Sequence, residues 1–205
     1  MANLLPNIAI VILAAGESKR MGLPKQLLQW GNASLIGHAV QTALKVPHKE
    51  VVVVLGANYV QVYNEIKHYS VTSLNNKDWE MGLGTSISKG INYIKNIRSN
   101  VDGVLIMLAD QPFITSNFLE LLIHDFKPNK NQIIATSYKK GTYGVPALFD
   151  KSYFDELIQL HDDFGAKYLL KKNESNVKVL TPPNKNIDLD TEEDYKLYRG
   201  LNLND

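Results

Sequence analysis

The chain has 205 residues, with 22 lysines and arginines against 21 aspartates and glutamates, so its formal net charge at pH 7 is +1. This balance argues against nucleic-acid binding through bulk electrostatics, and the absence of cysteine excludes a disulfide framework and thiolate metal sites. Because residues 1–6 do not resemble a signal peptide and no run of about 18 apolar residues occurs, we expect a cytoplasmic protein without membrane segments, folded as a single domain over residues 1–205.

The first predicted element is a strand over residues 8–13, a continuous run of apolar and mostly β-branched residues. Such a run suits a parallel strand with both faces covered by helices. Residues 14–16, Ala-Ala-Gly, let a ligand approach the backbone, and Lys19, Arg20 and Lys25 follow, as suits a polyphosphate site. The loop matches neither the Walker pattern nor the Gly-x-Gly-x-x-Gly pattern of dinucleotide loops, so an ordinary loop with solvated charges remains an alternative.

Strand-like and helix-like segments then alternate along the chain. The first are a helix over 35–44 with Ser34 as N-cap, a strand over 51–55, and a helix through Ile87, Ile91 and Ile94 after the Gly82/Gly84 loop. A strand over 104–108 follows, and then a helix through Leu119, Leu122, Ile123 and Phe126 that is capped by Thr115 or Ser116. The last elements are short strands over 133–136, 147–149 and 177–180 and a final helix opened by a capping box at 191–194. This alternation predicts a three-layer α/β/α domain with a mostly parallel sheet.

Acidic residues follow two of these segments. Asp110 comes just after the apolar run that ends at residue 108, and ligands of open parallel sheets bind beyond the carboxyl ends of strands. A carboxylate there can also form a turn. If residues 187–190 are extended, Asp188 and Asp190 point to the same side and can face Asp110, although one of them could instead cap the helix that opens at residue 191.

Residues 13–28, LAAGESKRMGLPKQLL, resemble the signature loop of the sugar-nucleotidyltransferase-like superfamily. Within it, the chain is most similar to the molybdenum-cofactor nucleotidyltransferases, above all their cytidylyltransferase branch. Further segments similar to that family's elements follow in the family's order, at 76–86, 108–113, 144–149, 163–167 and 187–194. The resemblance implies a Rossmann-like nucleotidyltransferase fold.

The resemblance also implies a reaction, in which the terminal phosphate of an acceptor attacks the α-phosphorus of a nucleoside triphosphate and pyrophosphate leaves. Lys25 would then stabilise charge growing on the α-phosphate, and Arg20 would grip the outgoing phosphates. Asp110, with Asp188 or Asp190, would hold Mg²⁺, which favours one or two carboxylates beside triphosphate oxygens and waters.

The remaining candidates concern nucleotide and cofactor binding. The resemblance implies backbone contacts to the nucleotide from Leu13, Ala14, Ala15 and Gly16, and it places Asn76, Gly82 and Ser86 where related enzymes handle nucleotide or cofactor. Backbone amides at the start of the helix through Ile87 would help to hold an anion. Trp79 suits a ring stacked on a ligand or, as we favour, partly buried packing.

CTP is the expected nucleotide, because Ala15 follows the cytidylyl pattern where guanylyl relatives carry glycine, and one methyl group takes space that a two-ring base needs. The acceptor implied is molybdopterin or its molybdenum-loaded form, with a molybdoenzyme as a candidate recipient of the product. Val145, where several relatives carry histidine, and residues 161–167 depart from the family pattern on the acceptor side. The alternatives are cytidylyl transfer to a sugar- or polyol-phosphate, and a non-catalytic protein that carries cofactor to a molybdoenzyme.

Overall fold

The computed structural model describes residues 5–97, 100–138, 141–161, 165–184 and 186–200. Its strands are β1 (Ile8–Ala14), β2 (Gln29–Trp30), β3 (Ala33–Ser34), β4 (Glu50–Leu55), β5 (Thr72–Asn75), β6 (Gly103–Leu108), β7 (Ile133–Ser137), β8 (Tyr143–Asp150) and β9 (Val177–Leu180). Its α-helices are α1 (Leu35–Leu44), α2 (Tyr59–Ile66), α3 (Leu83–Ile97), α4 (Ser116–Asp125), α5 (Phe154–Ile158), α6 (Ala166–Lys172) and α7 (Glu192–Tyr198).

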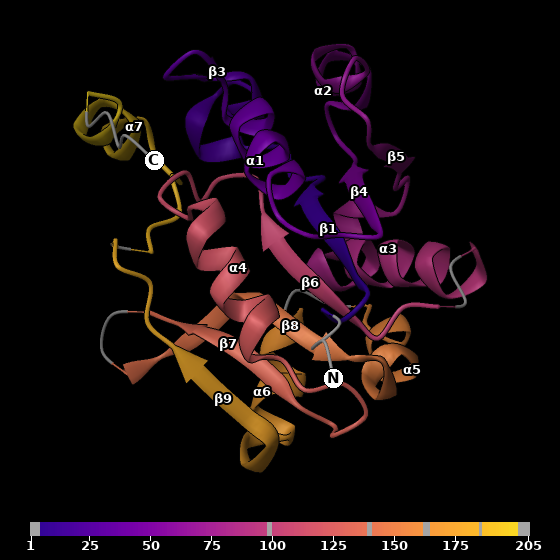
Figure 1. Cartoon of the computed structure of the whole chain (residues 1–205). Helices are drawn as coiled ribbons and strands as arrows, with labels where there is room; N and C mark the ends of the chain where they lie inside the picture. The colour runs from indigo at the N-terminus through magenta and orange to yellow at the C-terminus, as the bar shows by residue number, and fades with distance from the viewer. Residues whose placement is uncertain (1–4, 98–99, 139–140, 162–164, 185, 201–205) are drawn as a thin grey trace.

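Seven strands form one mixed sheet in the order β5-β4-β1-β6-β8-β7-β9, and β2 and β3 form a separate short hairpin (Figure 1). Strand β8 runs antiparallel to its neighbours β6 and β7, whereas the other neighbouring pairs in the sheet are parallel. The predicted α/β architecture with a mostly parallel sheet is therefore confirmed.

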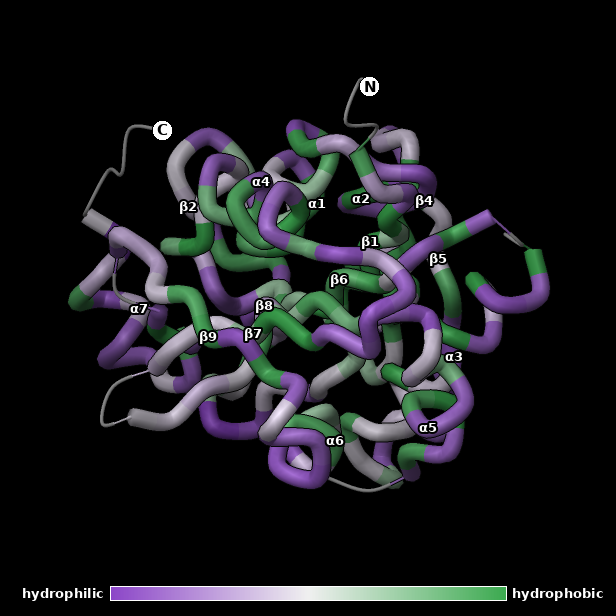
Figure 2. Tube along the Cα trace, turned by 60° about the horizontal axis from the view of Figure 1, so that its bottom comes forward, coloured by the Kyte–Doolittle hydropathy of each residue, from purple (hydrophilic) through white to green (hydrophobic). Residues whose placement is uncertain are grey.

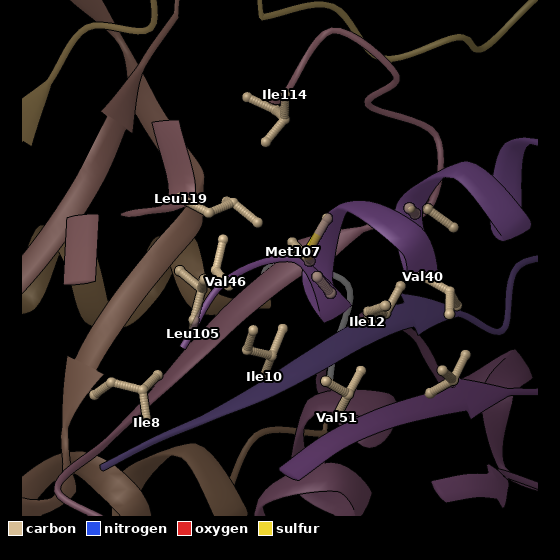
Figure 3. Close-up of a cluster of buried hydrophobic side chains, with 14 of the residues drawn as sticks. Ile8, Ile10, Ile12, Val40, Val46, Val51, Leu105, Met107, Ile114 and Leu119 are labelled. Atoms are coloured by element: carbon tan, nitrogen blue, oxygen red, sulfur yellow. The ribbon is translucent and has the colours of Figure 1, made fainter. Parts of the chain in front are cut away.

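Strand β1 shows how the sheet is covered on both faces. Its even-numbered side chains, among them Ile8, Ile10 and Ile12, belong to a core cluster with α1, α2 and α4. Its odd-numbered side chains belong to a second cluster with α3, α5 and α6. Figure 3 shows the three isoleucines beside Leu105 and Met107 of β6. Because alternate strand residues point to opposite faces, a fully apolar strand serves both helical layers.

The predicted helix caps agree with the structure. Ser34 caps α1 through its side chain, and of the two candidates for α4, Thr115 rather than Ser116 is the cap. The capping box at the start of α7 is formed by Thr191 and Asp194. These side chains satisfy backbone amides that a helix leaves without partners at its first turn.

Several predicted boundaries were wrong. Gly84 lies in the first turn of α3 rather than in a loop, and the predicted strand over 147–149 is the end of the longer β8. Residues 187–190, for which an extended conformation was considered but no strand predicted, belong to no strand. Strand β5, the β2–β3 hairpin and helices α2, α5 and α6 were not predicted.

The parallel strands at the centre of the sheet end at the same edge. Leu13 near the end of β1 is in register with Val54 of β4 and Leu108 of β6. Figure 2 shows apolar residues concentrated on these central strands and hydrophilic residues on the outer loops. The loops that follow β1, β4 and β6 therefore meet at one place. Within the described residues, no helix has the length and apolar character needed to cross a bilayer.

Candidate functional site

A cavity of about 600 Å³ opens at the carboxyl ends of β1 and β6. Its lining comes from the loop after β1, from the short 3₁₀ helix η2 (Lys25–Leu27), from the end of β6 and from the segment that leads into α3. The lining residues are Leu13, Ala14, Ala15, Gly16, Glu17, Ser18, Lys19, Lys25, Gln26, Leu35, Trp79, Glu80, Gly82, Leu83, Ser86, Leu108, Ala109 and Asp110.

A buried glutamine holds the loop after β1 in shape. The side-chain amide of Gln26 donates hydrogen bonds to the carbonyl oxygens of Ala14, at 3.2 Å, and Gly16, at 2.7 Å. The hydroxyl of Ser18, a residue with φ 63°, accepts a hydrogen bond from the backbone amide of Lys25 at 3.2 Å. These bonds fold the loop back on itself, so that the Lys25 side chain returns to the cavity.

Gly56, directly after β4, lets two walls of the cavity approach each other. A Cβ atom at Gly56 would lie 2.6 Å from the carbonyl oxygen of Ala15, 2.7 Å from the Cβ of Trp79 and 2.8 Å from the Cβ of Ala15. The methyl group of Ala15 is therefore packed against Gly56, and Ala15 is 7% exposed. Trp79 is half-buried, as favoured from the sequence, and also lines the cavity.

The segment before α3 is fixed by Asn76. This residue is buried, and its amide nitrogen donates to the hydroxyls of Thr85, at 2.9 Å, and Ser86, at 3.0 Å. Gly82 has a φ of 107°, a conformation that glycine adopts without steric cost. Asn76 stands behind the cavity wall and positions the residues that form it.

A cluster of ion pairs lies at one end of the cavity. The ammonium group of Lys25 pairs with the carboxylate of Asp110 and lies 3.0 Å from Asp190 Oδ1 and 3.3 Å from the carbonyl oxygen of Leu189. The guanidinium of Arg20 lies 3.1 Å from Asp190 Oδ2. The side chains of Lys25 and Asp110 are 17% and 14% exposed, whereas that of Arg20 is 69% exposed. The cluster thus joins the loop after β1, the end of β6 and the segment before α7.

The charges in this cluster shift one another's pKa values. Burial alone would lower the pKa of Lys25, but the carboxylates of Asp110 and Asp190 outweigh it and raise this pKa. Burial alone would raise the pKa of Asp190, but its ion pairs with Lys25 and Arg20 outweigh this effect and hold the pKa below its usual value. Asp188 differs, because burial and the negative charge of Asp110 raise its pKa against the effect of a hydrogen bond from Gln111. Lys25 also lowers this pKa, but among the described residues Asp188 forms no ion pair like those of Asp190.

A second cavity of about 690 Å³ adjoins the first and shares Leu13, Leu83 and Leu108 with it. Asp188 and two lysines supply its charged groups, and tyrosines and aliphatic side chains form much of the rest. The remaining lining residues are Ile87, Tyr138, Gly141, Thr142, Tyr143, Gly144, Val145, Ala166, Lys167, Leu170 and Lys171. A ligand with an apolar body and an anionic group fits this lining.

The carboxylates between the two cavities suit a hard divalent cation. Asp110 Oδ1 is buried and has no hydrogen-bond partner among the described residues, and the charges of Asp110 and Asp190 both act on Asp188. Oxygen donors of this kind are the ligands that Mg²⁺ and Mn²⁺ prefer. No group of three or more acidic or histidine side chains in the described part of the chain is already arranged around a metal position. One or two carboxylates are nevertheless enough for Mg²⁺ when phosphate oxygens and waters complete the shell.

The first cavity brings together most of the residues predicted for the site, namely Leu13, Ala14, Ala15, Gly16, Lys25, Gly82, Ser86 and Asp110. Arg20 and Asp190 adjoin it through the ion-pair cluster, and Asp188 lies in the second cavity. Lys19, one of the three cations noted after residue 16, also lines the first cavity. Gln26 and Gln111 were not among the predicted site residues. Of the motif at 163–167, residues 163 and 164 lie outside the described residues.

Comparison with known proteins gives one family match and several relatives of similar length. Residues 10–177 match the family model described as MobA-like NTP transferase domain. The purine catabolism protein PucB of Bacillus subtilis (strain 168) is 28% identical over 95% of this chain and 97% of its own length. Nicotine blue oxidoreductase of Paenarthrobacter nicotinovorans is 28% identical over 96% of this chain and 98% of its own length.

The fold is similar to that of a mycobacterial protein. The crystal structure of Rv0371c from Mycobacterium tuberculosis H37Rv has a TM-score of 0.82 and 27% sequence identity, and the match covers 95% of this chain and 97% of that chain. A structure of Rv0371C in complex with manganese has a TM-score of 0.77 and 25% identity, covering 93% of this chain and 97% of that chain.

Proposed function

The chain belongs to the MobA-like NTP transferase domain family, and on this premise we propose that it transfers CMP from CTP to the terminal phosphate of molybdopterin, or of its molybdenum-loaded form, and releases pyrophosphate. The observation that supports this most is the first cavity, where the close-packed backbone of residues 13–16, the Lys25 ammonium and the Asp110 carboxylate share one space. Backbone that a ligand can approach, a cation for phosphate and a carboxylate for metal are the groups that nucleotidyl transfer needs.

In this proposal the chain acts by positioning and by neutralising charge. The backbone of residues 13–16 holds the nucleotide, and Lys25 turns from its carboxylate partners to the α-phosphate, where negative charge grows as pyrophosphate leaves. Arg20, which is largely exposed beside the cavity, contacts the outgoing phosphates. Such reactions need no covalent intermediate on the protein, so alignment of the two substrates supplies much of the rate.

Asp110, with Asp188 or Asp190, would hold the divalent metal. Bound there, Mg²⁺ or Mn²⁺ would neutralise phosphate charge and help to orient the triphosphate. The unpartnered oxygen of Asp110 and the raised pKa of Asp188, which burial and the charge of Asp110 cause, both fit this assignment. The relative Rv0371C, whose structure contains manganese, supports a divalent metal in this chain as well.

The second cavity is the proposed acceptor site. It adjoins the nucleotide cavity at Leu13 and Leu108, so an acceptor there can present a phosphate to the nucleotide. Lys167 and Lys171 offer positive charge, and Tyr138 and Tyr143 offer flat apolar surface, as a phosphorylated pterin would need. CTP is proposed because the methyl group of Ala15 packs against Gly56 and holds the loop in place. A loop held there leaves less space for a two-ring base than for a pyrimidine.

Pyrophosphate release across a panel of nucleotides and acceptors tests the proposal. The purified protein is assayed with CTP, GTP, ATP and UTP, each combined with molybdopterin, with a sugar-phosphate, with a polyol-phosphate or with no acceptor. Release that requires both CTP and molybdopterin is expected. Release with a sugar- or polyol-phosphate instead would reassign the acceptor, and binding of molybdopterin without release from any nucleotide would identify a carrier. NADH oxidation is followed in the same panel, because one relative is named nicotine blue oxidoreductase and a redox activity would be detected in this way.

A further inference from the structure

Gln111 lies directly after the metal candidate Asp110 but lines neither cavity. It is 4% exposed. Its side-chain nitrogen donates a hydrogen bond to Asp188 Oδ1 at 2.8 Å, approaches the carbonyl oxygen of Val145 at 3.2 Å and contacts the hydroxyl of Tyr138. A buried side-chain amide with several acceptors on one nitrogen has its position fixed by them.

These contacts join three segments that are far apart in the sequence. Gln111 belongs to the loop after β6, Tyr138 and Val145 to the β7–β8 region, and Asp188 to the segment before α7. The hydroxyl of Tyr138 itself donates to the carbonyl oxygen of Val145 at 2.7 Å, so that it can accept from the Gln111 amide. Tyr138, Val145 and Asp188 all line the second cavity. One amide group thus ties the wall of the acceptor cavity to the loop that carries Asp110.

The position of the Asp188 carboxylate depends on the Gln111 amide more than the position of the Asp190 carboxylate does. Lys25 and Arg20 neutralise Asp190, whereas within the described residues the hydrogen-bond donor that Asp188 meets is Gln111. The carboxylate of Asp188 also faces the negative charges of Asp110 and Asp190. Without the amide, repulsion would favour a carboxylate turned away from Asp110.

We infer that Gln111 is a positioning residue: its amide holds the Asp188 carboxylate beside Asp110, at the border between the two cavities, and so aligns the metal-holding groups with the acceptor. This inference rests on the proposed function. Gln111 lines neither of the two proposed reactant cavities, and in this inference it acts through its hydrogen bond to Asp188. Partners that orient a metal ligand commonly change metal affinity or activity by 10–100-fold when they are replaced.

The test uses Gln111→Met, which keeps the length of the side chain and removes its donors. The affinity for Mn²⁺ in the presence of CTP is measured by electron paramagnetic resonance, and steady-state kinetics are measured with molybdopterin. The variant is expected to bind Mn²⁺ at least about tenfold more weakly and to have a higher KM for molybdopterin and a lower kcat, with the KM for CTP within about twofold of wild type.

Gln26 offers a matched control, because it is also a buried glutamine beside the site, but its amide holds the carbonyl groups of the nucleotide loop. Gln26→Met is expected to raise the KM for CTP and to leave the KM for molybdopterin within about twofold. General loosening of the fold would raise both KM values in both variants. A raised KM for molybdopterin in Gln111→Met only, and a raised KM for CTP in Gln26→Met only, would show that Gln111 positions the acceptor side.

Action through Asp188 is tested by combining Gln111→Met with Asp188→Asn. The double variant should be no worse than Asp188→Asn alone, since the residue through which Gln111 acts is already impaired. Further loss in the double variant, or wild-type Mn²⁺ affinity and molybdopterin KM in folded Gln111→Met, overturns the inference. If Gln111→Met does not fold, Gln111→Asn, which withdraws the amide by one methylene group, has to show the same weakening of Mn²⁺ affinity. Wild-type protein that binds no Mn²⁺ with CTP would instead refute the proposed function itself.

Discussion

The Nζ atom of Lys25 lies 3.0 Å from Asp190 Oδ1, and the same ammonium group pairs with Asp110. The lysine therefore supplies positive charge to two of the carboxylates to which we assign the metal, and Arg20 adds to it at Asp190. A free divalent ion and Lys25 compete for these oxygens, whereas a bound nucleotide offers the lysine a phosphate instead.

Lys25→Met is expected to increase the affinity for free Mn²⁺ in the absence of nucleotide by at least about tenfold, because a like charge about one ion-pair distance away costs more than 1 kcal/mol in a partly buried site. Titration of Mn²⁺ into the nucleotide-free protein, followed by electron paramagnetic resonance, measures this. Unchanged or weaker binding would show that Lys25 and the metal do not share Asp110 and Asp190. Lys95→Met is a suitable control, because Lys95 pairs with Asp155 outside the site.

The same Lys25→Met variant is expected to lose turnover to a greater extent than nucleotide affinity. An interaction made mainly in the transition state appears in kcat, whereas one made equally in the bound substrate appears in KM. Full turnover with a raised KM for CTP would make Lys25 a contact to the bound phosphates only.

Asp110→Asn is expected to lower turnover about a hundredfold or more without unfolding the protein, because losing a group that stabilises charge in the transition state commonly has this effect. Activity of the wild type should also disappear with a chelator and return with Mg²⁺ or Mn²⁺. Circular dichroism checks the fold of the variant. Near wild-type turnover of Asp110→Asn at saturating Mg²⁺ would disprove the metal assignment.

CTP is expected to be used better than GTP, and Ala15→Gly to relax this preference without abolishing use of CTP. The Ala15 methyl lies against Gly56, so its removal allows the loop to move back and widens the space for a base. A single methyl group changes discrimination by about 1–3 kcal/mol. Specificity constants for both nucleotides on both proteins measure the effect. GTP used as well as CTP by the unmodified protein would refute the cytidylyl assignment.

Gly56→Ala is expected to lower stability by about 1–3 kcal/mol and to weaken CTP binding, because the added methyl would lie 2.6 Å from the Ala15 carbonyl oxygen and force the loop to move. Gly200→Ala is the control, since a Cβ atom at Gly200 meets nothing within 4 Å. Urea unfolding and CTP titration of both variants provide the measurements. If Gly56→Ala and Gly200→Ala had the same stability and the same affinity for CTP, the loop after β1 would have to accommodate the added methyl group without loss of free energy.

The core strands and the capped helices could be predicted from the sequence because their signals are local. Strand β1 is one apolar run, Ser34 is a standard cap before the apolar periodicity of α1, and Thr191 with Asp194 forms a capping box that can be read from the sequence. Strand β5 has no such signal, since Thr72–Asn75 is mostly polar and lies at the edge of the sheet. The full length of β8 was hidden because Gly144 and Pro146 interrupt the apolar pattern of the strand.

The site shows the same division. Asp110 carries charge just after an apolar run, and Lys25 carries charge in the loop that follows another, at the strand ends where the fold class itself predicts ligands. Gln26 and Gln111 act through hydrogen bonds to backbone and side chains brought close only by the tertiary structure, and a single glutamine in a loop has no pattern in the sequence. Asn76 was predicted to lie where related enzymes handle nucleotide or cofactor, and in the structure its amide bonds to residues of the segment before and at the start of α3.

The most direct test of the central claim follows the α-phosphate of CTP. The protein is incubated with Mg²⁺, molybdopterin and CTP labelled at the α-phosphorus, and the products are separated and identified by mass. Label is predicted to appear in a molybdopterin–CMP conjugate, with one pyrophosphate released per conjugate and none formed by Asp110→Asn. Label that stays in CTP, or appears only in free CMP while molybdopterin remains unmodified, would contradict nucleotidyl transfer to molybdopterin by this chain.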